Sequence, residues 1–326
     1  MLTNFAVFDF MATFGSKYPD VENWSTIELS GRNFNPARGW YEVWRQAPSD
    51  EILLPPKHLV TEEIEPYFAV VNSRSEIITQ NKGALRVISS TMESKVVHFS
   101  EPQKGKLLNQ VLMGIAVDSK DNVYAIRWLQ TQTHILGNAV NDKNYVMYVL
   151  DNDYNVKHWC TLDFLDAIHR MTVKNATDEN NDIIMIGNLD YNVYVCDNMG
   201  ILKYKFERDQ RLLHTVTISR KNEIMARSDQ RDSVFMYTKD GTLKTTIKVP
   251  EGHIVKGFTV HYVMSKIIVL AYNGRRDSFF FLCYSKKGEL ESTMFIGKSN
   301  DYFIPYIASH PSGPVAFIQR RSITFI

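Results

Sequence analysis

The stretch Gly114-Ile115-Ala116-Val117-Asp118 is a short apolar segment that ends in a polar residue, and the same pattern occurs six times along the chain. The other five segments are Phe68–Asn72, Met171–Asn175, Val216–Ser219, Phe258–Tyr262 and Ile307–His310. The six segments end at residues 72, 118, 175, 219, 262 and 310, so successive steps are 46, 57, 44, 43 and 48 residues. A four-stranded propeller blade takes roughly 40 to 45 residues before loop insertions are added. The spacing therefore predicts six blades.

Shorter patterns within each unit predict the other strands of a blade. After Val216–Ser219 the chain continues with three further strand-like segments, Glu223–Ala226, Ser233–Tyr237 and Leu243–Val249. Turn sequences that end in glycine occupy the same place in successive units: Asn198-Met199-Gly200, Lys239-Asp240-Gly241 and Lys286-Lys287-Gly288. Glycine readily supplies the positive φ that a tight hairpin needs. We therefore predict an all-β fold, a six-bladed β-propeller of four-stranded antiparallel blades.

The two ends of the chain are expected to meet in the last blade. The sixth unit offers strands near Ile307, Val315–Gln319 and Ser322–Ile326, which is one strand fewer than a blade needs. A propeller protects its strand edges only when the ring closes. We expect an N-terminal strand near residues 24–29 to complete this blade. Residues 1–66 are then an N-terminal arm that contains the closing strand, and residues 67–326 form the propeller.

Composition narrows the class of protein. The 326 residues are 44% hydrophobic and carry a formal net charge of +1, so neither a disordered chain nor a nucleic-acid-coating protein is indicated. Three cysteines without metal-ligand spacing predict neither a disulfide framework nor a zinc module. No apolar run reaches the roughly 18 residues of a membrane helix. We expect a cytoplasmic protein that does not bind membranes and needs no cofactor.

Two pairs of segments resemble the NHL repeat, the unit of the C-terminal propellers of tripartite-motif (TRIM) proteins. They are Gly114–Asp118 with Asp121–Ala125, and Asn192–Val195 with Asp197–Gly200. The resemblance covers about residues 67–326, although the Asn-His-Leu signature of the repeat is missing. It implies a recognition module, the targeting part of a ubiquitin-ligase-type protein. This sequence has no zinc-ligand spacing of the kind that a RING domain requires.

No catalytic motif is found, so we do not expect an enzyme and name no catalytic or metal-binding residue. The chain lacks a P-loop, a Gly-x-Ser-x-Gly elbow and a His-Glu-x-x-His helix. A propeller site assembled from distant loops would escape such searches. His169, His214 and His253 fall in equivalent loops between blades. A propeller hydrolase or lyase with an axial metal therefore stays open as an alternative.

The expected strand order separates the charges onto two faces. Loops between blades and loops between the second and third strands of a blade share what we call the first face; the remaining turns share the opposite face. The first face is assigned 16 cationic and 12 acidic residues, an excess of +4, and the opposite face 8 and 13, a balance of −5. The binding residues predicted on the first face are Arg170, Arg208, Arg211, Arg227, Arg231, Arg275, Arg276, Arg320, Arg321, Tyr191 and Tyr272.

Two kinds of partner fit such a face. A protein partner is the first expectation, because binding residues concentrate on loops that a rigid scaffold carries. The long insertion Trp128–Asn144, which includes His134, is the predicted partner loop. Single-stranded RNA is the alternative, since Arg donates bidentately to phosphate and both Arg and Tyr stack on bases. Arg-Asp pairs such as Arg231-Asp232 and Arg276-Asp277 also allow a solvated rim that pairs with itself.

Overall fold

The computed structural model of the chain describes most of the propeller. The described residues are 58–59, 68–81, 83–100, 106–135, 138–166, 173–187, 191–207, 212–219, 221–228, 230–262, 264–298, 305–311, 313, 315–319 and 322–325. Every regular element in these ranges is a β-strand. Within the same ranges there is no helix of the length and apolarity that crossing a membrane requires.

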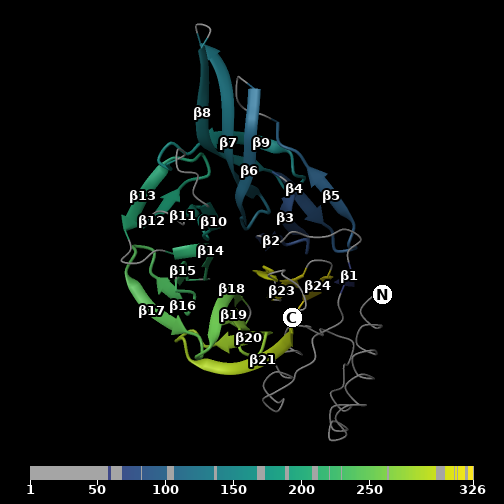
Figure 1. Cartoon of the computed structure of the whole chain (residues 1–326), viewed down its shortest axis with the longest axis vertical. Coiled ribbons are helices and arrows are strands. Elements are labelled where there is room, and N and C mark those ends of the chain that lie inside the picture. Colours follow the sequence, from purple (N-terminus) through teal and green to yellow (C-terminus); the bar gives the residue numbers. More distant parts are fainter. Residues whose placement is uncertain are drawn as a thin grey trace, which may run out of the picture.

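Six four-stranded antiparallel sheets are arranged in a ring (Figure 1), which confirms the predicted six-bladed propeller. We number these sheets as blades 1 to 6 along the chain. In each of blades 1 to 5 the four strands follow one another in sequence order, from the inner to the outer strand. The strands of blades 1 to 3 are β2 (Ala69–Val71), β3 (Ile77–Asn81), β4 (Ala84–Ile88), β5 (Ser94–Val97), β6 (Lys106–Val117), β7 (Val123–Ile135), β8 (Asn138–Leu150), β9 (Val156–Thr161), β10 (Val173–Thr177), β11 (Ile183–Gly187), β12 (Asn192–Cys196) and β13 (Leu202–Glu207).

Blades 4 and 5 repeat this order, and blade 6 takes its outermost strand from the N-terminal part of the chain. The strands are β14 (Leu212–Ile218), β15 (Ile224–Ser228), β16 (Ser233–Tyr237), β17 (Leu243–Lys248), β18 (His253–His261), β19 (Lys266–Asn273), β20 (Ser278–Tyr284), β21 (Leu290–Lys298), β22 (Tyr306–Ser309), β23 (Val315–Ile318), β24 (Ser322–Phe325) and β1 (His58–Leu59).

The inner strands form a closed circle. Each of β2, β6, β10, β14, β18 and β22 contacts the inner strand of the next blade, and β22 contacts β2. The predicted three C-terminal strands are present as β22, β23 and β24. Strand β1 pairs with β24, His58 opposite Ile323 and Leu59 opposite Ser322. The closing strand that we expected at 24–29 lies outside the described residues and stays a prediction.

The core lies between neighbouring blades. One cluster joins blades 2 and 3 around Met147 and Met185, and another joins blades 4 and 5 around Met225 and Val269. Blades 5 and 6 meet where the ring of Phe281 contacts that of Phe317, an edge contact with 5.2 Å between centroids. The central strands are buried along their whole length, as in β11 and β16, because a blade is covered on both faces. This explains their nearly continuous apolar sequence.

The predicted hairpin glycines have the backbone that their turns require. Gly200, Gly241 and Gly288 have φ of +79°, +90° and +84°. In each turn the glycine N–H donates to the carbonyl of the residue three positions earlier, Asp197, Thr238 and Ser285. The sequence prediction of strand, turn and strand at these places is confirmed.

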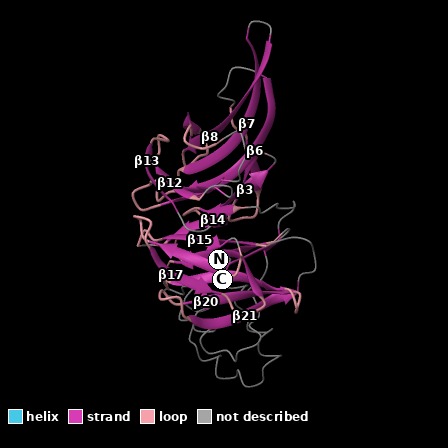
Figure 2. Ribbon diagram, turned by 60° about the vertical axis from the view of Figure 1, so that its left-hand side comes forward, coloured by secondary structure: helices cyan, strands magenta, loops and turns pink. Residues whose placement is uncertain are grey.

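The segment predicted as a partner loop is a β-hairpin. Strands β7 and β8 pair without interruption from Val123 opposite Leu150 to Ile135 opposite Asn138. The hairpin extends well beyond the ring of blades (Figures 1 and 2). Trp128 is only 3% exposed and belongs to the core between blades 2 and 3, so it is not a surface residue. The loop interpretation is therefore wrong, because the polar residues past Trp128 continue both strands.

Candidate functional site

The opposite face is held together by its own turns. Side chains at the ends of the inner strands and in the turns after them form hydrogen bonds from one blade to the next around the whole ring. The contacts are Asp121 with Ser73, Ser119 with Asn181, Asn222 with Glu179, Tyr262 with the carbonyl of Ile218, Thr259 with Ser309, and Ser75 with His310. These hydrogen bonds hold neighbouring blades together on the opposite face.

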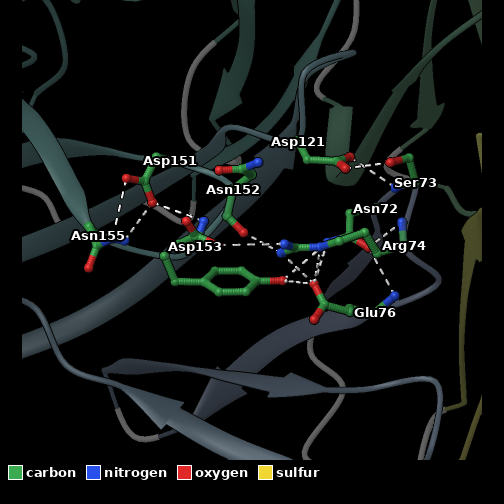
Figure 3. A network of polar contacts seen from close by, with 10 residues as sticks. Asn72, Ser73, Arg74, Glu76, Asp121, Asp151, Asn152, Asp153 and Asn155 are labelled. Atoms are coloured by element: carbon green, nitrogen blue, oxygen red, sulfur yellow. Dashed lines mark hydrogen bonds and ion pairs between the residues drawn. The ribbon is translucent and has the colours of Figure 1, made fainter.

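A polar network on the same face links blades 1 and 2 (Figure 3). Arg74 pairs with Glu76 at 2.7 Å and donates to the carbonyl of Asn152, and the Tyr154 hydroxyl donates to Glu76. Burial disfavours the ionised Glu76, but the hydrogen bonds from Tyr154 and Asn72 and the charge of Arg74 outweigh it, so the pKa of Glu76 is lowered. The network keeps its charges paired.

Ion pairs between described residues lie on this opposite face and on strands beside it. Lys239 donates to Asp178 at 3.0 Å, a contact that raises the pKa of Lys239, and Lys203 contacts Asp182 at 2.5 Å. Asp178 and Asp182 are almost fully buried, so an unpaired charge there would be costly. The excess of acidic residues predicted for this face is thus partly neutralised within the fold.

The first face carries a group of four described cations on blades 4 and 5. Arg231, Lys256, Arg275 and Arg276 make no ion pair with any described residue. The carboxylates that neighbour these cations accept hydrogen bonds from hydroxyl groups instead. Asp232 accepts from Ser233 at 2.5 Å and Ser228 at 3.1 Å, and Asp277 accepts from Tyr272 at 2.7 Å.

The self-paired rim that the sequence allowed is therefore not formed at these positions. Arg231, Arg275 and Arg276 are exposed to solvent. The turn that carries Arg275 and Arg276 is fixed by Asn273, whose side-chain oxygen accepts from both backbone N–H groups at 3.1 and 3.2 Å. A rigid turn thus presents two unpaired arginines.

Three cations gather where blades 4 and 5 meet on this face. Arg227 in β15 is only 7% exposed, and its Nη1 donates to the carbonyls of Val255 at 2.9 Å and Lys256 at 3.3 Å. The backbone carbonyl of Arg231 accepts from the N–H of Val255 at 2.6 Å. The expectation that Arg227 lies on the surface is wrong: strand β15 is buried on both sides, so its side chain lies inside the ring wall.

The pKa values of Arg227 and Lys256 are both lowered, by burial and by the neighbouring cations. Burial, helped by the nearby charge of Arg231, lowers the pKa of Arg227 to about 10. Burial also lowers the pKa of Lys256, with Arg231 and Arg227 acting in the same direction. The ammonium of Lys256 lies 5.3 Å from the centroid of the Tyr272 ring. Sequence reasoning placed Lys256 on this face but not among the binding residues.

The structure places the remaining predicted residues as follows. Tyr191 is 39% exposed before β12, whereas Tyr272 lies within β19, so their positions are not equivalent. The ring of Tyr272 packs against Phe279, 5.1 Å between centroids, and is covered by Lys256. Asn144 lies half-buried in β8, and His134 lies in β7 with its side chain outside the description. The arginines that fall outside the described residues are Arg170, Arg208, Arg211, Arg320 and Arg321.

A further buried cation lies near the inner strands. Lys174 in β10 donates from Nζ to the carbonyl of Met113 at 2.8 Å and lies 3.7 Å from the centroid of the Phe68 ring. Burial lowers the pKa of Lys174 to about 7. Its amine thus links three blades, a role that could not be predicted because Lys174 follows the same sequence pattern as exposed strand ends.

The channel enclosed by the inner strands holds a small cavity. Its volume is about 150 Å³, and every blade contributes to its lining, with Val71, Val117, Thr177, Thr217, Thr259 and Ser309 among the residues. Pockets that bind drug-sized ligands usually have volumes of roughly 300 Å³ or more. The cavity therefore has room for water or a very small molecule only.

The alternative of an axial metal finds no ligand set among the described residues. These residues contain no group of three or more His, Cys, Asp or Glu side chains that could hold a metal ion. His253 lies with its Nδ1 3.3 Å from the carbonyl of Glu251 and its Nε2 3.4 Å from Asn273. His169 lies outside the described residues, and the side chain of His214 is not described.

Comparisons with solved structures agree with the fold. The chain is similar to virginiamycin B lyase from Staphylococcus aureus (TM-score 0.51, 9% identity, 83% of this chain and 99% of that one). It is also similar to a chain of a mitotic checkpoint complex (TM-score 0.54, 10% identity, 86% and 95%). A protein of unknown function from Bacteroides caccae gives a TM-score of 0.55 at 7% identity, over 74% and 84% of the two chains.

At such low identity these likenesses show the fold alone, a six-bladed β-propeller similar to the lyase. No family model matches the sequence, and no curated protein matches it. The class of protein defined so far is therefore a six-bladed propeller with hydrogen bonds between blades on the opposite face and, on the first face, four cations without an acidic partner among the described residues.

Proposed function

We propose that this propeller is a noncatalytic recognition module whose first face binds an acidic segment of a protein partner. The observation that carries the proposal is the group of four cations on blades 4 and 5 of the first face. Arg74 and Lys239 on the opposite face are paired with Glu76 and Asp178, whereas Arg231, Lys256, Arg275 and Arg276 have no acidic partner among the described residues. Complementary charge on a partner would steer association and fix its register.

An acidic protein segment is preferred to RNA because of the aromatic side chains. Sequence-tolerant RNA binding relies on exposed rings on which bases stack. Tyr272, one of the two predicted stacking residues, is engaged by Asp277, Lys256 and Phe279. Guanidinium groups pair with carboxylates through charge-assisted, bidentate hydrogen bonds, which need no aromatic ring.

The resemblance to NHL propellers adds a finer proposal. In TRIM proteins such a propeller follows the domains that carry ligase activity, and it supplies the targeting function. The first face of this chain would play the same part, in a cytoplasmic protein that recruits its partner through acidic residues. The six-bladed ring with an asymmetric charge distribution supports this reading.

The experiment compares two probes under one condition. Equilibrium binding of the full chain to a fluorescent oligoglutamate peptide and to a randomised single-stranded RNA pool is measured across a salt series. We expect the peptide to bind more tightly at physiological salt, with an affinity that falls as salt rises. Tight RNA binding with selective enrichment and a steep salt slope would favour the RNA alternative instead. If neither probe binds, the proposal fails.

A further inference from the structure

Three cations lie together where blades 4 and 5 meet: the buried guanidinium of Arg227, the exposed guanidinium of Arg231 and the half-buried ammonium of Lys256, a cluster that we call the recess. Arg227 and Arg231 come from β15 and the turn after it, and Lys256 comes from β18. Two backbone contacts hold the recess together: the Arg227 Nη1 bond to the carbonyl of Val255, at 2.9 Å, and the Val255 N–H bond to the carbonyl of Arg231, at 2.6 Å. The cations are therefore fixed close together by the backbone, and not by chance contacts of long side chains.

No anion in the described structure offsets this concentration of charge. The pKa values of both Arg227 and Lys256 are lowered, first by burial and then by the neighbouring cations. The Nε of Arg227 is buried and has no hydrogen-bond partner. A buried carboxylate elsewhere in the molecule, that of Asp178, is paired with Lys239. Uncompensated cations held in place cost free energy that a bound anion would offset.

We propose that this recess binds a single oxyanion group, a carboxylate or a phosphoryl group, at Lys256 and Arg231, with Arg227 strengthening the positive field from behind. The inference rests on the proposed function, because the acidic segment of the partner would supply the group. Lys256 is well placed for this role, because a cation–π contact with Tyr272 positions its ammonium, 5.3 Å from the centroid of the ring. Arg231 adds a planar donor fork from the exposed side.

The recess is distinct from the pair Arg275 and Arg276. Those side chains lie on the turn between β19 and β20, which Asn273 fixes, and they are exposed. They would contact the partner at the rim of the interface, where a charge changes the rate of association more than the equilibrium affinity. The recess, partly withdrawn from water, would discriminate a compact anion from a diffuse negative surface.

The test uses inorganic phosphate as the probe, with thermal stability of the full chain as the readout. Phosphate is compared with chloride at equal ionic strength in the wild type, in Lys256→Met and in Lys286→Met. Lys286 is an exposed control in the same blade, on the opposite face. We expect phosphate to raise the melting temperature of the wild type and of Lys286→Met by several degrees, and not that of Lys256→Met. Equal responses in all three proteins, or no response, would overturn the proposal.

Two additional measurements keep the inference separable from the proposed function. Arg231→Gln, a change at an exposed side chain, should reduce the phosphate response even if Lys256→Met folds poorly. Isotope-labelled lysine NMR should show that phosphate raises the pKa of Lys256, because an anion favours its charged form; an unchanged pKa would count against the site. If oligoglutamate binds the wild type and Lys256→Met equally well, the recess fails while the proposed function survives. If phosphate acts at Lys256 but oligoglutamate does not bind, the recess is supported and the proposed function fails.

The source of the oxyanion is resolved by two peptides that differ at one position, which is glutamate in one and phosphoserine in the other. Dependence of either affinity on Lys256 supports the recess and identifies the group. A phosphoserine carries close to two negative charges near neutral pH and three acceptor oxygens, so it would gain more from three cations. We expect Lys256→Met to weaken the preferred peptide about tenfold, which corresponds to about 1.4 kcal/mol. Equal affinities of wild type and variant for both peptides would overturn the proposal.

Discussion

His261, at the end of β18, is a buried base whose titration should be visible in the stability of the protein. It is 2% exposed, its Nδ1 lies 3.3 Å from the N–H of Met264, and its Nε2 is buried without a hydrogen-bond partner. Burial lowers the pKa of His261 to about 4, from an ordinary value of 6.5. Between these two values the unfolded chain binds a proton that the folded chain does not.

We therefore predict that His261 destabilises the fold as the pH falls from 6.5 towards 4. Replacing it by Asn, which keeps an acceptor near Met264, should reduce the loss of unfolding free energy over this range by about 3 kcal/mol. Urea unfolding of both proteins at a series of pH values measures the difference. Above pH 7 the two proteins should respond to pH in parallel. Curves that stay parallel down to pH 4 would show that His261 does not titrate in this way.

At the same scale, single residues show what the sequence could and could not predict. The burial of Arg227 was foreseeable, since it lies between Ala226 and Ser228 in a strand that neighbours cover on both faces. The position of Lys256 was not, because it lies at a shift in the pairing register of β18 and β19, between Val255 and Gly257. Such a bulge depends on how two strands pair, and a sequence pattern does not record it.

Among the elements, the strand that completes blade 6 offers the clearest prediction. Strand β1 pairs with β24 through His58 and Leu59 only, while the sequence pointed to residues 24–29. We predict that deleting residues 1–57 leaves the melting temperature nearly unchanged, because β1 is retained. Deleting residues 1–66 should lower it by several degrees and broaden the transition, because β24 then lacks its outer neighbour. Scanning calorimetry of the three proteins gives the answer. If removing residues 1–57 already has the full effect, the closing strand lies upstream of β1.

The elements also show where periodicity works as a guide. Apolar runs and glycine turns predicted the blade strands, because every blade must bury both faces of its sheet and reverse the chain tightly. The long hairpin was missed because its outer part leaves the core. Residues 139–143 of β8 are exposed and mostly polar, so nothing in their pattern distinguishes a strand from a loop. Backbone pairing with β7 alone determines their structure.

For the whole molecule, the separation of the two faces is the central property. Counting charged residues in the sequence predicts a positive excess on the first face and a negative excess on the opposite face. The count does not show which of these charges form ion pairs. The structure supplies that distinction: Asp232 and Asp277 accept from hydroxyl groups, and the arginines beside them stay unpaired. The small channel and its hydroxyl-rich wall offer no comparable site for a large ligand. Binding through the first face is therefore the account of this propeller that its charges support best.

The most direct test compares two matched double variants, one on each face of blade 5. Arg275→Gln with Arg276→Gln removes two unpaired cations from the first face, and Lys286→Gln with Lys287→Gln removes two exposed cations from the opposite face. Both pairs change the net charge equally and lie in turns between strands of one blade. Affinity for oligoglutamate is measured by fluorescence anisotropy at low and physiological salt. We predict that the first-face variant binds about tenfold more weakly, or about 1.4 kcal/mol, and that the opposite-face variant binds like the wild type. Equal losses in the two variants would contradict the account.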